Sequence, residues 1–520
     1  MCAASFATSR ARWNGVHTMR QRTYFILTLA AIVALAGLTP SSSNAQEEHP
    51  PLDLFFTAIS ADRGAANDAL ETLEENWRPG YAPMMIEFIR FLKRGNAVNA
   101  GGMIAGGGDR VVDGEFATGE GARDGIDNDR FASRRDPRVQ ATERVVNFIQ
   151  DRTGQDFGDD YAAWRDWMWE QDYEPHPQYG FLKANLYANI DPNFQKFFNG
   201  ESNIRLDEID WGGVAVGGIP ALDNAPTVGV SQAGYLADSD VVFGISVNGE
   251  HRAYPKRILA WHELAWDNLG GQPLTIVYCT LCGTVIPYNS EVGGREVKFD
   301  TSGLLYRSNK LLYDDISFTL WSSLTGEPVA GPMVGYDVKL TPNAAVTTTW
   351  GEWKATHPDT TVLSLDTGFE RDYSEGAAYA AYFASDELMF GVSQTDSRLK
   401  NKDEILALRF DTNSGPQALA VAADYLQSNP VFQTNFAGRD LVMVTSPGGA
   451  NRVYAASGYS FDRMSADGKV VDSNGETWTA AEDRLIPDSD PTGGLVRLPA
   501  FRAFWFGWYA QYPNTELIGN

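Results

Sequence analysis

Cysteine is scarce in this chain, with only Cys2, Cys279 and Cys282 among 520 residues. So few cysteines in a chain of this length exclude a fold built on a disulfide framework. Cys2 lies at the extreme N-terminus and is lost if that segment is removed. The remaining pair therefore acts locally, whatever its chemistry.

Positive charge is also in short supply. Lys and Arg together number 42 against 67 Asp and Glu, which gives a formal net charge of -25. Nucleic-acid binding requires clustered basic side chains on one face, so we expect no nucleic-acid partner. An acidic surface of this kind keeps a secreted protein soluble.

Long apolar runs are missing beyond the N-terminus. One run of moderate length, residues 24–38, follows Arg20 and Arg22 and precedes the small residue Ala45. This pattern predicts a secretory signal peptide over residues 1–45, with Met19 as an alternative start and an uncleaved anchor as the lesser alternative. We therefore expect a secreted or periplasmic protein without a membrane span after signal cleavage.

Residues 50–200 have the spacing of apolar residues that is typical of helices. The stretch GAANDALETLEENW, which is followed by a Pro-Gly turn, favours stacked antiparallel helices of the HEAT type. Within this region, residues 100–136 are rich in Gly, Asp and Arg, and we predict a mobile surface loop there. The aromatic cluster of Trp164, Trp167 and Trp169 is expected to belong to the core or to a domain interface rather than to a ligand site.

From residue 204 onward, short β-rich runs alternate with Gly, Asn and Pro turns. The pattern W-x-x-W-x-x-x-[HY]-P-[DN]-T begins at Trp350 and again at Trp505. We therefore predict two duplicated, mainly β modules over residues 204–365 and 400–520. The fold class is α+β, with a helical HEAT-like N-terminal domain followed by these two modules.

The stretch TIVYCTLCGTVIPY places Cys279 and Cys282 on a turn between two β runs. No helix is expected after the pair, because Val285 and Ile286 are β-branched and a proline follows. This arrangement, in which a Cys-x-x-Cys-Gly turn connects two strands, resembles a metal-binding knuckle. Gly283 would let the chain turn at this point.

A transition-metal site is the leading hypothesis for this turn, and it requires ligands beyond the two sulfurs. His262, in a short segment expected to be helical, is the best third ligand, and Glu263 or His251 could be the fourth. Two thiolates and one imidazole suit copper or zinc. The predicted metal-ligand set is therefore Cys279, Cys282, His262 and Glu263. The predicted role of the metal is metal handling or redox support.

Two other interpretations stay open. Cys279 and Cys282 could form a thiol–disulfide oxidoreductase pair with His262 as proton shuttle. Alternatively, the pair is a local clip within a structural or interaction module that docks an unknown protein partner. Whether the chain is an enzyme is left open, and its catalytic residues are unknown.

Other candidate residues carry weaker signals. Ser302, Tyr306, Arg307, Asp314 and Asp315 are close in sequence and could line a pocket, but no nucleophile and base can be paired from their spacing. The second predicted module has VTSPGGA where the first has YCTLCGT, and it has no counterpart of His262. The predicted fold therefore tolerates the loss of these residues, which makes them better candidates for function than for structure.

Several stretches, among them AYPKRILAWHELAW, YCTLCGT and WGEWKATHPDT, resemble the domain-of-unknown-function 3179 family of exported bacterial and archaeal proteins. The resemblance covers about residues 204–520 and extends to the Trp-rich helices expected over residues 155–200. It implies that Tyr254, His262, Glu263, Cys279, Cys282 and Gly283 match the family signature. It implies no particular activity, and the second module departs from the signature.

Overall fold

The computed structural model describes residues 49–93 and 136–519. The predicted signal peptide lies outside the described residues, and so does the predicted loop over residues 100–136 except for its last residue. Within the described ranges, no helix is both long enough and apolar enough to cross a bilayer.

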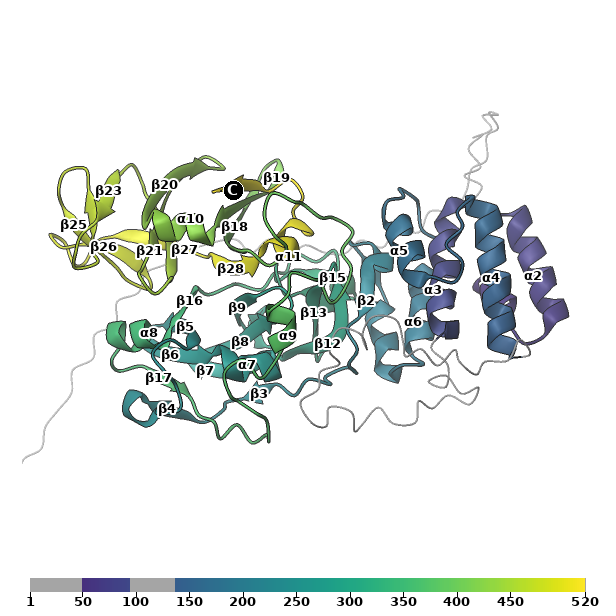
Figure 1. Ribbon diagram of the computed structural model, residues 1–520, viewed down its shortest axis with the longest axis horizontal. Coiled ribbons are helices and arrows are strands. Elements are labelled where there is room, and N and C mark those ends of the chain that lie inside the picture. Colours follow the sequence, from purple (N-terminus) through teal and green to yellow (C-terminus); the bar gives the residue numbers. More distant parts are fainter. Residues whose placement is uncertain (1–48, 94–135, 520) are drawn as a thin grey trace, which may run out of the picture. The chain divides into compact units, whose positions relative to one another are not determined.

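The N-terminal part of the described chain is helical (Figure 1). Its α-helices are Leu52–Ala58 (α1), Arg63–Glu75 (α2), Ala82–Lys93 (α3), Pro137–Thr153 (α4), Tyr161–Trp169 (α5) and Tyr179–Tyr187 (α6). Local sequence sets their ends: the Asp62 carboxylate caps α2 by accepting the N–H groups of Gly64 and Ala65. Gly154, at φ +72°, ends α4 in the left-handed conformation. The helical start is confirmed, while the HEAT-type stacking stays a prediction.

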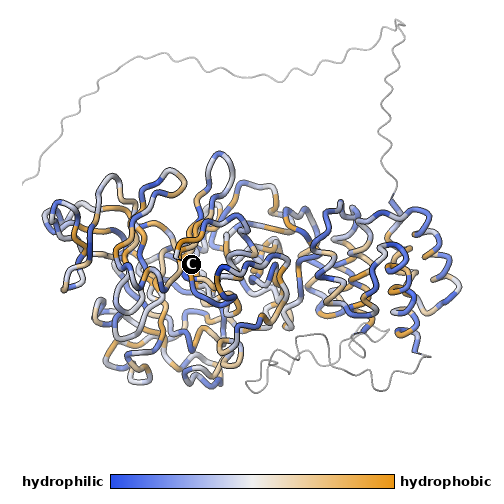
Figure 2. The backbone as a smooth tube through the Cα atoms, turned by 45° about the horizontal axis from the view of Figure 1, so that its top comes forward, coloured by the Kyte–Doolittle hydropathy of each residue, from blue (hydrophilic) through white to orange (hydrophobic). Residues whose placement is uncertain are grey.

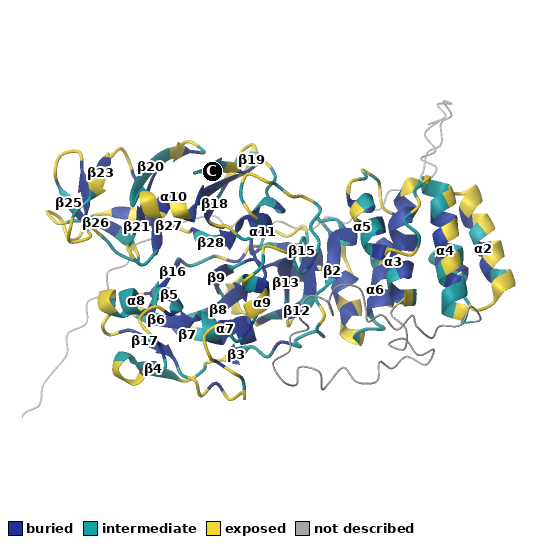
Figure 3. Cartoon of the chain, in the orientation of Figure 1, coloured by how far each residue is buried: buried dark blue, intermediate teal, exposed yellow. Residues whose placement is uncertain are grey.

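Helices and sheet share one core at the junction between the two regions. The apolar faces of α3, α5 and α6 pack together with strand residues such as Ile209 and Leu304. Trp164 and Trp169 are buried in this core and Trp167 packs against it, as the sequence predicted. Figure 3 shows α3 and α6 largely buried and α2 with a wide exposed face.

The remainder of the described chain is rich in β-sheet, as predicted. Figure 2 shows hydrophobic segments that alternate with hydrophilic ones along this part of the chain. One sheet has the order β16-β5-β6-β17-β4, and a later one has the order β28-β18-β19-β29. The strands of the first are Thr227–Gly229 (β4), Val241–Val247 (β5), Glu250–Pro255 (β6), Ala345–Thr349 (β16) and Thr361–Leu363 (β17). Those of the second are Glu404–Thr412 (β18), Gly415–Ala422 (β19), Phe501–Phe504 (β28) and Glu516–Ile518 (β29).

The four strands β16, β5, β6 and β17 of the first sheet correspond in order to β28, β18, β19 and β29 of the second, and β4 has no counterpart in the second sheet. In each sheet, the first strand of the central hairpin (β5 or β18) pairs antiparallel with a strand much later in the chain (β16 or β28). The second strand of the hairpin (β6 or β19) pairs parallel with a strand that comes later still (β17 or β29). Trp353 donates its indole N–H to Thr360 at 2.9 Å, and Trp508 donates to Thr515 at 2.9 Å. The two Trp-containing repeats in the sequence therefore occupy matching places in the two sheets.

Short helices and three further sheets complete the β region, together with a small hairpin. The helices are Lys256–His262 (α7), Trp350–Thr356 (α8), Ala380–Phe383 (α9), Ala423–Ser428 (α10) and Trp505–Tyr509 (α11). The sheet β3-β7-β8-β9 consists of Leu222–Asp223, Leu264–Leu269, Gln272–Cys279 and Thr284–Asn289. The sheet β1-β15-β14-β13-β12-β2 consists of Glu201–Ser202, Pro328–Gly331, Leu320–Ser322, Asn309–Asp314, Phe299–Tyr306 and Ile209–Trp211.

The last sheet belongs to the C-terminal part of the chain and has the order β20-β21-β22-β27-β26-β25-β24-β23. Its strands, in chain order, are Val431–Phe436, Arg439–Thr445, Asn451–Ala455, Phe461–Met464, Val470–Asp472, Thr477–Ala480, Arg484–Pro487 and Leu495–Leu498. The small hairpin pairs β10 (Glu291–Val292) with β11 (Arg295–Glu296). Of these elements, the turn between β8 and β9 positions the candidate site.

Candidate functional site

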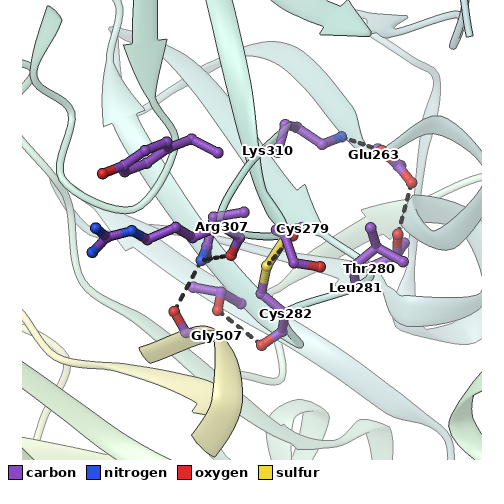
Figure 4. The surroundings of a disulfide bond; sticks show 12 residues. Glu263, Cys279, Thr280, Leu281, Cys282, Arg307, Lys310 and Gly507 are labelled. Atoms are coloured by element: carbon purple, nitrogen blue, oxygen red, sulfur yellow. Dashed lines mark hydrogen bonds and ion pairs between the residues drawn. A yellow bond between two sulfur atoms is a disulfide. The ribbon is translucent and has the colours of Figure 1, made fainter. Parts of the chain in front are cut away.

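The Cys-x-x-Cys segment forms the turn between β8 and β9, as the sequence predicted. Cys279 is the last residue of β8 and pairs with Thr284, the first of β9. The Cys282 N–H donates to the Cys279 carbonyl at 3.2 Å, and Gly283 follows at φ +64°. Cys279 and Cys282 are joined by a disulfide, with their Cα atoms 5.3 Å apart (Figure 4). Of the three hypotheses for this pair, a disulfide fits the oxidoreductase and the clip.

Both cysteines are buried beneath two distant parts of the chain. Cys279 is 4% exposed and Cys282 is 1% exposed. Tyr382, on α9, donates its hydroxyl to the Leu281 carbonyl at 2.8 Å, and the Phe504 N–H donates to the Cys282 carbonyl at 2.7 Å. The second β region and the segment that connects the two regions therefore both close over the disulfide.

Beside the disulfide lies a buried ion pair between Glu263 and Lys310, each with a side chain 6% exposed (Figure 4). One carboxylate oxygen of Glu263 also accepts the hydroxyls of Thr280, at 2.7 Å, and Tyr379, at 2.8 Å. Burial raises the pKa of Tyr379 well above its ordinary value, and the negative charge of the nearby Glu263 carboxylate raises it further. Thr280 lies between the two cysteines, so this charged cluster is hydrogen-bonded directly to the disulfide turn.

Glu263 reaches this turn because of its backbone conformation. It follows the last residue of α7 with φ +57°, and its N–H bonds back to the Leu259 carbonyl. Its own carbonyl accepts the Tyr278 N–H at 2.8 Å, which ties the end of the helix to β8. A left-handed residue other than Gly is uncommon and turns the chain sharply at this point.

His262 immediately precedes Glu263 but is held elsewhere. Its Nδ1 lies 2.8 Å from the Pro220 carbonyl and its Nε2 lies 2.6 Å from the Tyr373 hydroxyl. Since a carbonyl only accepts, Nδ1 carries the proton and Nε2 accepts from Tyr373. Burial lowers the pKa of His262, while the bond to Pro220 opposes this shift.

The four predicted metal ligands are thus engaged with other partners. The sulfurs are bonded to each other, Glu263 pairs with Lys310, and both nitrogens of His262 are hydrogen-bonded. In the part of the chain that the structure describes, no three His, Cys, Asp or Glu side chains are grouped to hold a metal ion. In this arrangement these side chains do not fit a copper or zinc ion, and the predicted metal centre stays a prediction.

The remaining candidates from the sequence have structural partners. His251 bonds to the Ser246 hydroxyl at 2.6 Å and stacks on His357, with ring centroids 4.1 Å apart. The Tyr254 hydroxyl donates to Asp267 at 2.6 Å. The partners of His251, the alternative fourth ligand, and of Tyr254, a signature residue, therefore lie outside the disulfide turn.

The weaker candidate residues, which follow β11 in the chain, also form contacts within the fold. Ser302 donates to the Leu311 carbonyl at 2.6 Å, Arg307 pairs with Glu208, and Asp314 accepts the indole N–H of Trp321 at 3.0 Å. Tyr306 packs against the core shared by helices and sheet. The Asp315 N–H donates to the Lys298 carbonyl at 3.1 Å.

Sequence reasoning missed Lys310 and Tyr379, which complete the charged cluster. Lys310 lies on β13, where five of the six residues are buried. A lysine directly before two leucines in the β-rich run NKLLYD was the available signal, because an ammonium that the sheet buries requires a carboxylate partner. Tyr379 gave no comparable signal, since it lies in a connecting segment without regular alternation.

No curated protein and no solved structure matches the chain. One family model matches residues 216–515, which is more than half of the chain and includes the disulfide turn, Glu263, Lys310 and Tyr379. The model's description is "Protein of unknown function (DUF3179)". The extent of this match establishes the family predicted from the motifs, and the chain belongs to the DUF3179 family.

Proposed function

We propose that the chain is an exported thiol–disulfide oxidoreductase in which Cys279 and Cys282 cycle between disulfide and dithiol. One observation carries this proposal: the buried Glu263–Lys310 pair is hydrogen-bonded to Thr280, between the two cysteines. A buried ion pair is weak evidence for stability, because desolvation offsets much of its attraction. Buried charges next to a reactive group are instead typical of sites where charge changes during a reaction.

The reaction requires a dithiol on a partner molecule as the reductant. One partner thiolate attacks the sulfur of Cys279, the more exposed of the two cysteines. The bond between Cys279 and Cys282 breaks, a mixed disulfide forms, and the sulfur of Cys282 leaves as a thiolate that takes up a proton. The second partner thiolate then attacks the mixed disulfide, and Cys279 leaves and is protonated. The partner loses two electrons and two protons, and the cysteine pair gains both.

The charged cluster suits this exchange because two thiolates form next to it. Lys310 supplies a positive charge, which favours a thiolate over a thiol. Glu263 holds that ammonium in place and links it through Thr280 to the turn. These residues position and stabilise charge, while the two cysteines carry the covalent chemistry.

Access to the sulfurs requires movement of the cover. Tyr382 and Phe390 come from the connecting segment and Phe504 comes from the second β region, and all three pack on the disulfide turn. A partner must displace some of these side chains before it can reach Cys279. We therefore expect exchange with small thiols to be slow relative to exchange at an exposed disulfide.

The reduction potential tests the proposal. The full chain is equilibrated in buffers of defined dithiol-to-disulfide ratio, and free thiols are trapped with a maleimide and counted by mass. We expect a potential within the range of exchange proteins, about -120 to -270 mV, whereas a value below about -300 mV would identify a structural disulfide and refute the proposal.

A lysine substitution separates the role of the cluster from general effects. Lys310→Met removes the cation beside the turn and should make the potential more negative, because the reduced form loses stabilisation of its thiolate. Lys354→Met is the matched control, since Lys354 also forms an ion pair, with Asp238 at 2.6 Å, but lies on α8. Equal potentials for the two variants would contradict a role of Lys310 in the exchange.

A local clip is the second candidate, and the burial of the disulfide among apolar side chains favours it. A clip acts through stability alone. Closing a loop of four residues is worth about 2 kcal/mol in the chain-entropy model, so a Cys279→Ser, Cys282→Ser double variant should lose about that much. A loss of this size together with a potential below the exchange range would favour the clip over the oxidoreductase.

A further inference from the structure

A second feature of the β region lies next to the disulfide turn, and its charged side chains take no part in the proposed exchange. It is a cavity of about 180 Å³ between the first sheet, the second sheet and the β8–β9 turn. Residues of both β regions line it. Those that matter for its chemistry are Lys256, Tyr278, Gly283, Glu404, Arg502 and Phe504.

Lys256 is the unusual member of this lining. It is the first residue of α7, and its ammonium has no hydrogen bond or ion pair with any residue that the structure describes. Its Nζ lies over the ring of Phe383, 4.2 Å from the ring centroid. Burial lowers the pKa of Lys256, while the more distant carboxylates of Glu404 and Glu375 raise it. A largely buried ammonium without a carboxylate partner is rare in a folded protein.

The other charges at the cavity neutralise each other. Arg502 forms an ion pair with Glu404 and also donates to the Asn451 side chain at 2.7 Å and to the Gly449 carbonyl at 3.0 Å. Its guanidinium is therefore already satisfied, and Glu404 is already paired. Among the residues that line the cavity, the positive charge of Lys256 is therefore left without a counter-charge. Glu352, which is not among the lining residues, accepts hydrogen bonds from Thr348 and Gly448.

The walls of the cavity fix the kind of anion that fits. Phe243, Tyr278 and Phe504 line it with aromatic rings, and the rings of Phe243 and Tyr278 lie 4.9 Å apart. Its volume is below the roughly 300–1,000 Å³ of pockets for drug-sized ligands. Bare phosphate or sulfate would leave these aromatic walls without a partner, whereas a carboxylate with a small apolar body would contact both parts.

We propose that this cavity binds a small organic carboxylate, with Lys256 pairing with the carboxylate and the aromatic walls contacting the apolar body. The site goes beyond the proposed exchange and does not depend on it, because no lining residue has to be reduced. Pockets between two parts of a protein are common ligand sites. The aromatic lining and the unpartnered ammonium supply the two kinds of contact that such a ligand requires.

The test measures the binding of benzoate and of its neutral analogue benzamide to the full chain in its oxidised form by isothermal titration calorimetry. We expect benzoate to bind at least about tenfold more tightly than benzamide, because a hydrogen bond to a charged group is worth more than one to a neutral group. The proposal would be overturned by equal affinities for benzoate and benzamide. It would also be overturned if no benzoate bound up to about 10 mM, a limit that corresponds to a binding free energy below about 3 kcal/mol.

Variants then assign the contact. Lys256→Met should weaken benzoate binding at least about tenfold, and Lys256→Arg should restore most of it. Lys298→Met is the matched control: Lys298 also lies over an aromatic ring, Trp266 at 4.1 Å, but it pairs with Asp223 and does not line the cavity. Unchanged binding in the Lys256→Met variant would overturn the assignment. If that variant does not fold, the comparison of benzoate with benzamide on the unmodified chain decides.

The two proposals fail separately. Loss of benzoate binding in a chain whose cysteine pair has an exchange-type potential would overturn the cavity site alone. Benzoate binding by a chain with a strongly negative potential would overturn the exchange alone.

Discussion

Replacing Glu263 by Gln tests the energetic coupling within the charged cluster. Gln has nearly the same shape, and its amide oxygen can still accept the hydroxyls of Thr280 and Tyr379. The left-handed backbone at position 263 is kept under similar strain, since Gln and Glu have comparable side chains. The substitution therefore removes the charge that Lys310 faces and little else.

The expected loss is large because both partners are buried. Removing one member of a buried ion pair leaves an uncompensated charge and costs about 3–5 kcal/mol. Removing both, as in a Glu263→Gln, Lys310→Met double variant, leaves no charge behind and should cost less than the sum of the two single changes. The exposed pair of Lys298 and Asp223, with side chains 46% and 52% exposed, is the control, and Asp223→Asn should cost no more than about 1 kcal/mol.

Hydrogen exchange of the β8–β9 hairpin measures this loss where it occurs. A loss of about 3 kcal/mol in the opening free energy accelerates exchange of protected amides by more than about a hundredfold. Peptides spanning residues 272–289, followed by mass spectrometry, report it, and tryptophan fluorescence in guanidinium gives the global midpoint. The reasoning would be refuted if the amide exchange rates of the Glu263→Gln variant stayed within about fivefold of those of the unmodified chain, which is a difference of about 1 kcal/mol. Strictly additive single and double variants would refute the coupling between Glu263 and Lys310.

Two further substitutions test the turn and the buried histidine. Gly283→Ala places a Cβ 2.9 Å from the ring of Phe504 and also suffers from φ +64°, whereas Gly294→Ala, at φ +77°, meets nothing within 4 Å. We expect Gly294→Ala to cost about 1–2 kcal/mol and Gly283→Ala about 1–3 kcal/mol more, and equal guanidinium midpoints would refute a tight contact with Phe504. Burial lowers the pKa of His262, so its contribution to stability is complete above the ordinary value of about 6.5 and is lost as the pH falls through the folded-state pKa. His262→Gln should therefore reduce the fall of the unfolding midpoint between about pH 7 and pH 5, and an unchanged fall would contradict this.

The parts of the site that depend on neighbours in the sequence were predictable. The Cys-x-x-Cys turn between two strands follows from the β-branched residues on either side and from Gly283, and the structure has β8 and β9 there. The short helix before Glu263 was also predicted and is α7. Local preferences decide such elements, because the residues that fix them are adjacent in the chain.

The partners of the turn were not predictable, because they come from distant segments. Lys310, Tyr379 and Phe504 meet the turn only after the sheets have packed. The sequence also suggested that His262 and Glu263 serve one site, since they are neighbours. The left-handed backbone at Glu263 separates them: Glu263 turns toward Thr280, while His262 stays bonded to Pro220 and Tyr373.

The second β region lacks the cysteines but has a counterpart of their turn. Between β21 and β22, Ser446 and Gly448 donate to the carboxylate of Glu352, which belongs to α8 of the first region. The β8–β9 turn is bonded from the second region by a different kind of contact: Phe504, which precedes α11, donates its backbone N–H to the Cys282 carbonyl. Each region thus uses the strand and helix at its end to hold the turn of the other.

This reciprocal contact gives the second region a role that does not require cysteines. Phe504 covers the disulfide through its bond to the Cys282 carbonyl and also lines the cavity beside Lys256. Any movement of β28 away from the β8–β9 turn would expose the disulfide and open the cavity together. A carboxylate bound between the two regions would oppose that movement, because it binds the closed arrangement and not the open one. If both proposals hold, saturating benzoate should slow reduction of the disulfide by a dithiol in the unmodified chain, and it should leave the rate unchanged in the Lys256→Met variant.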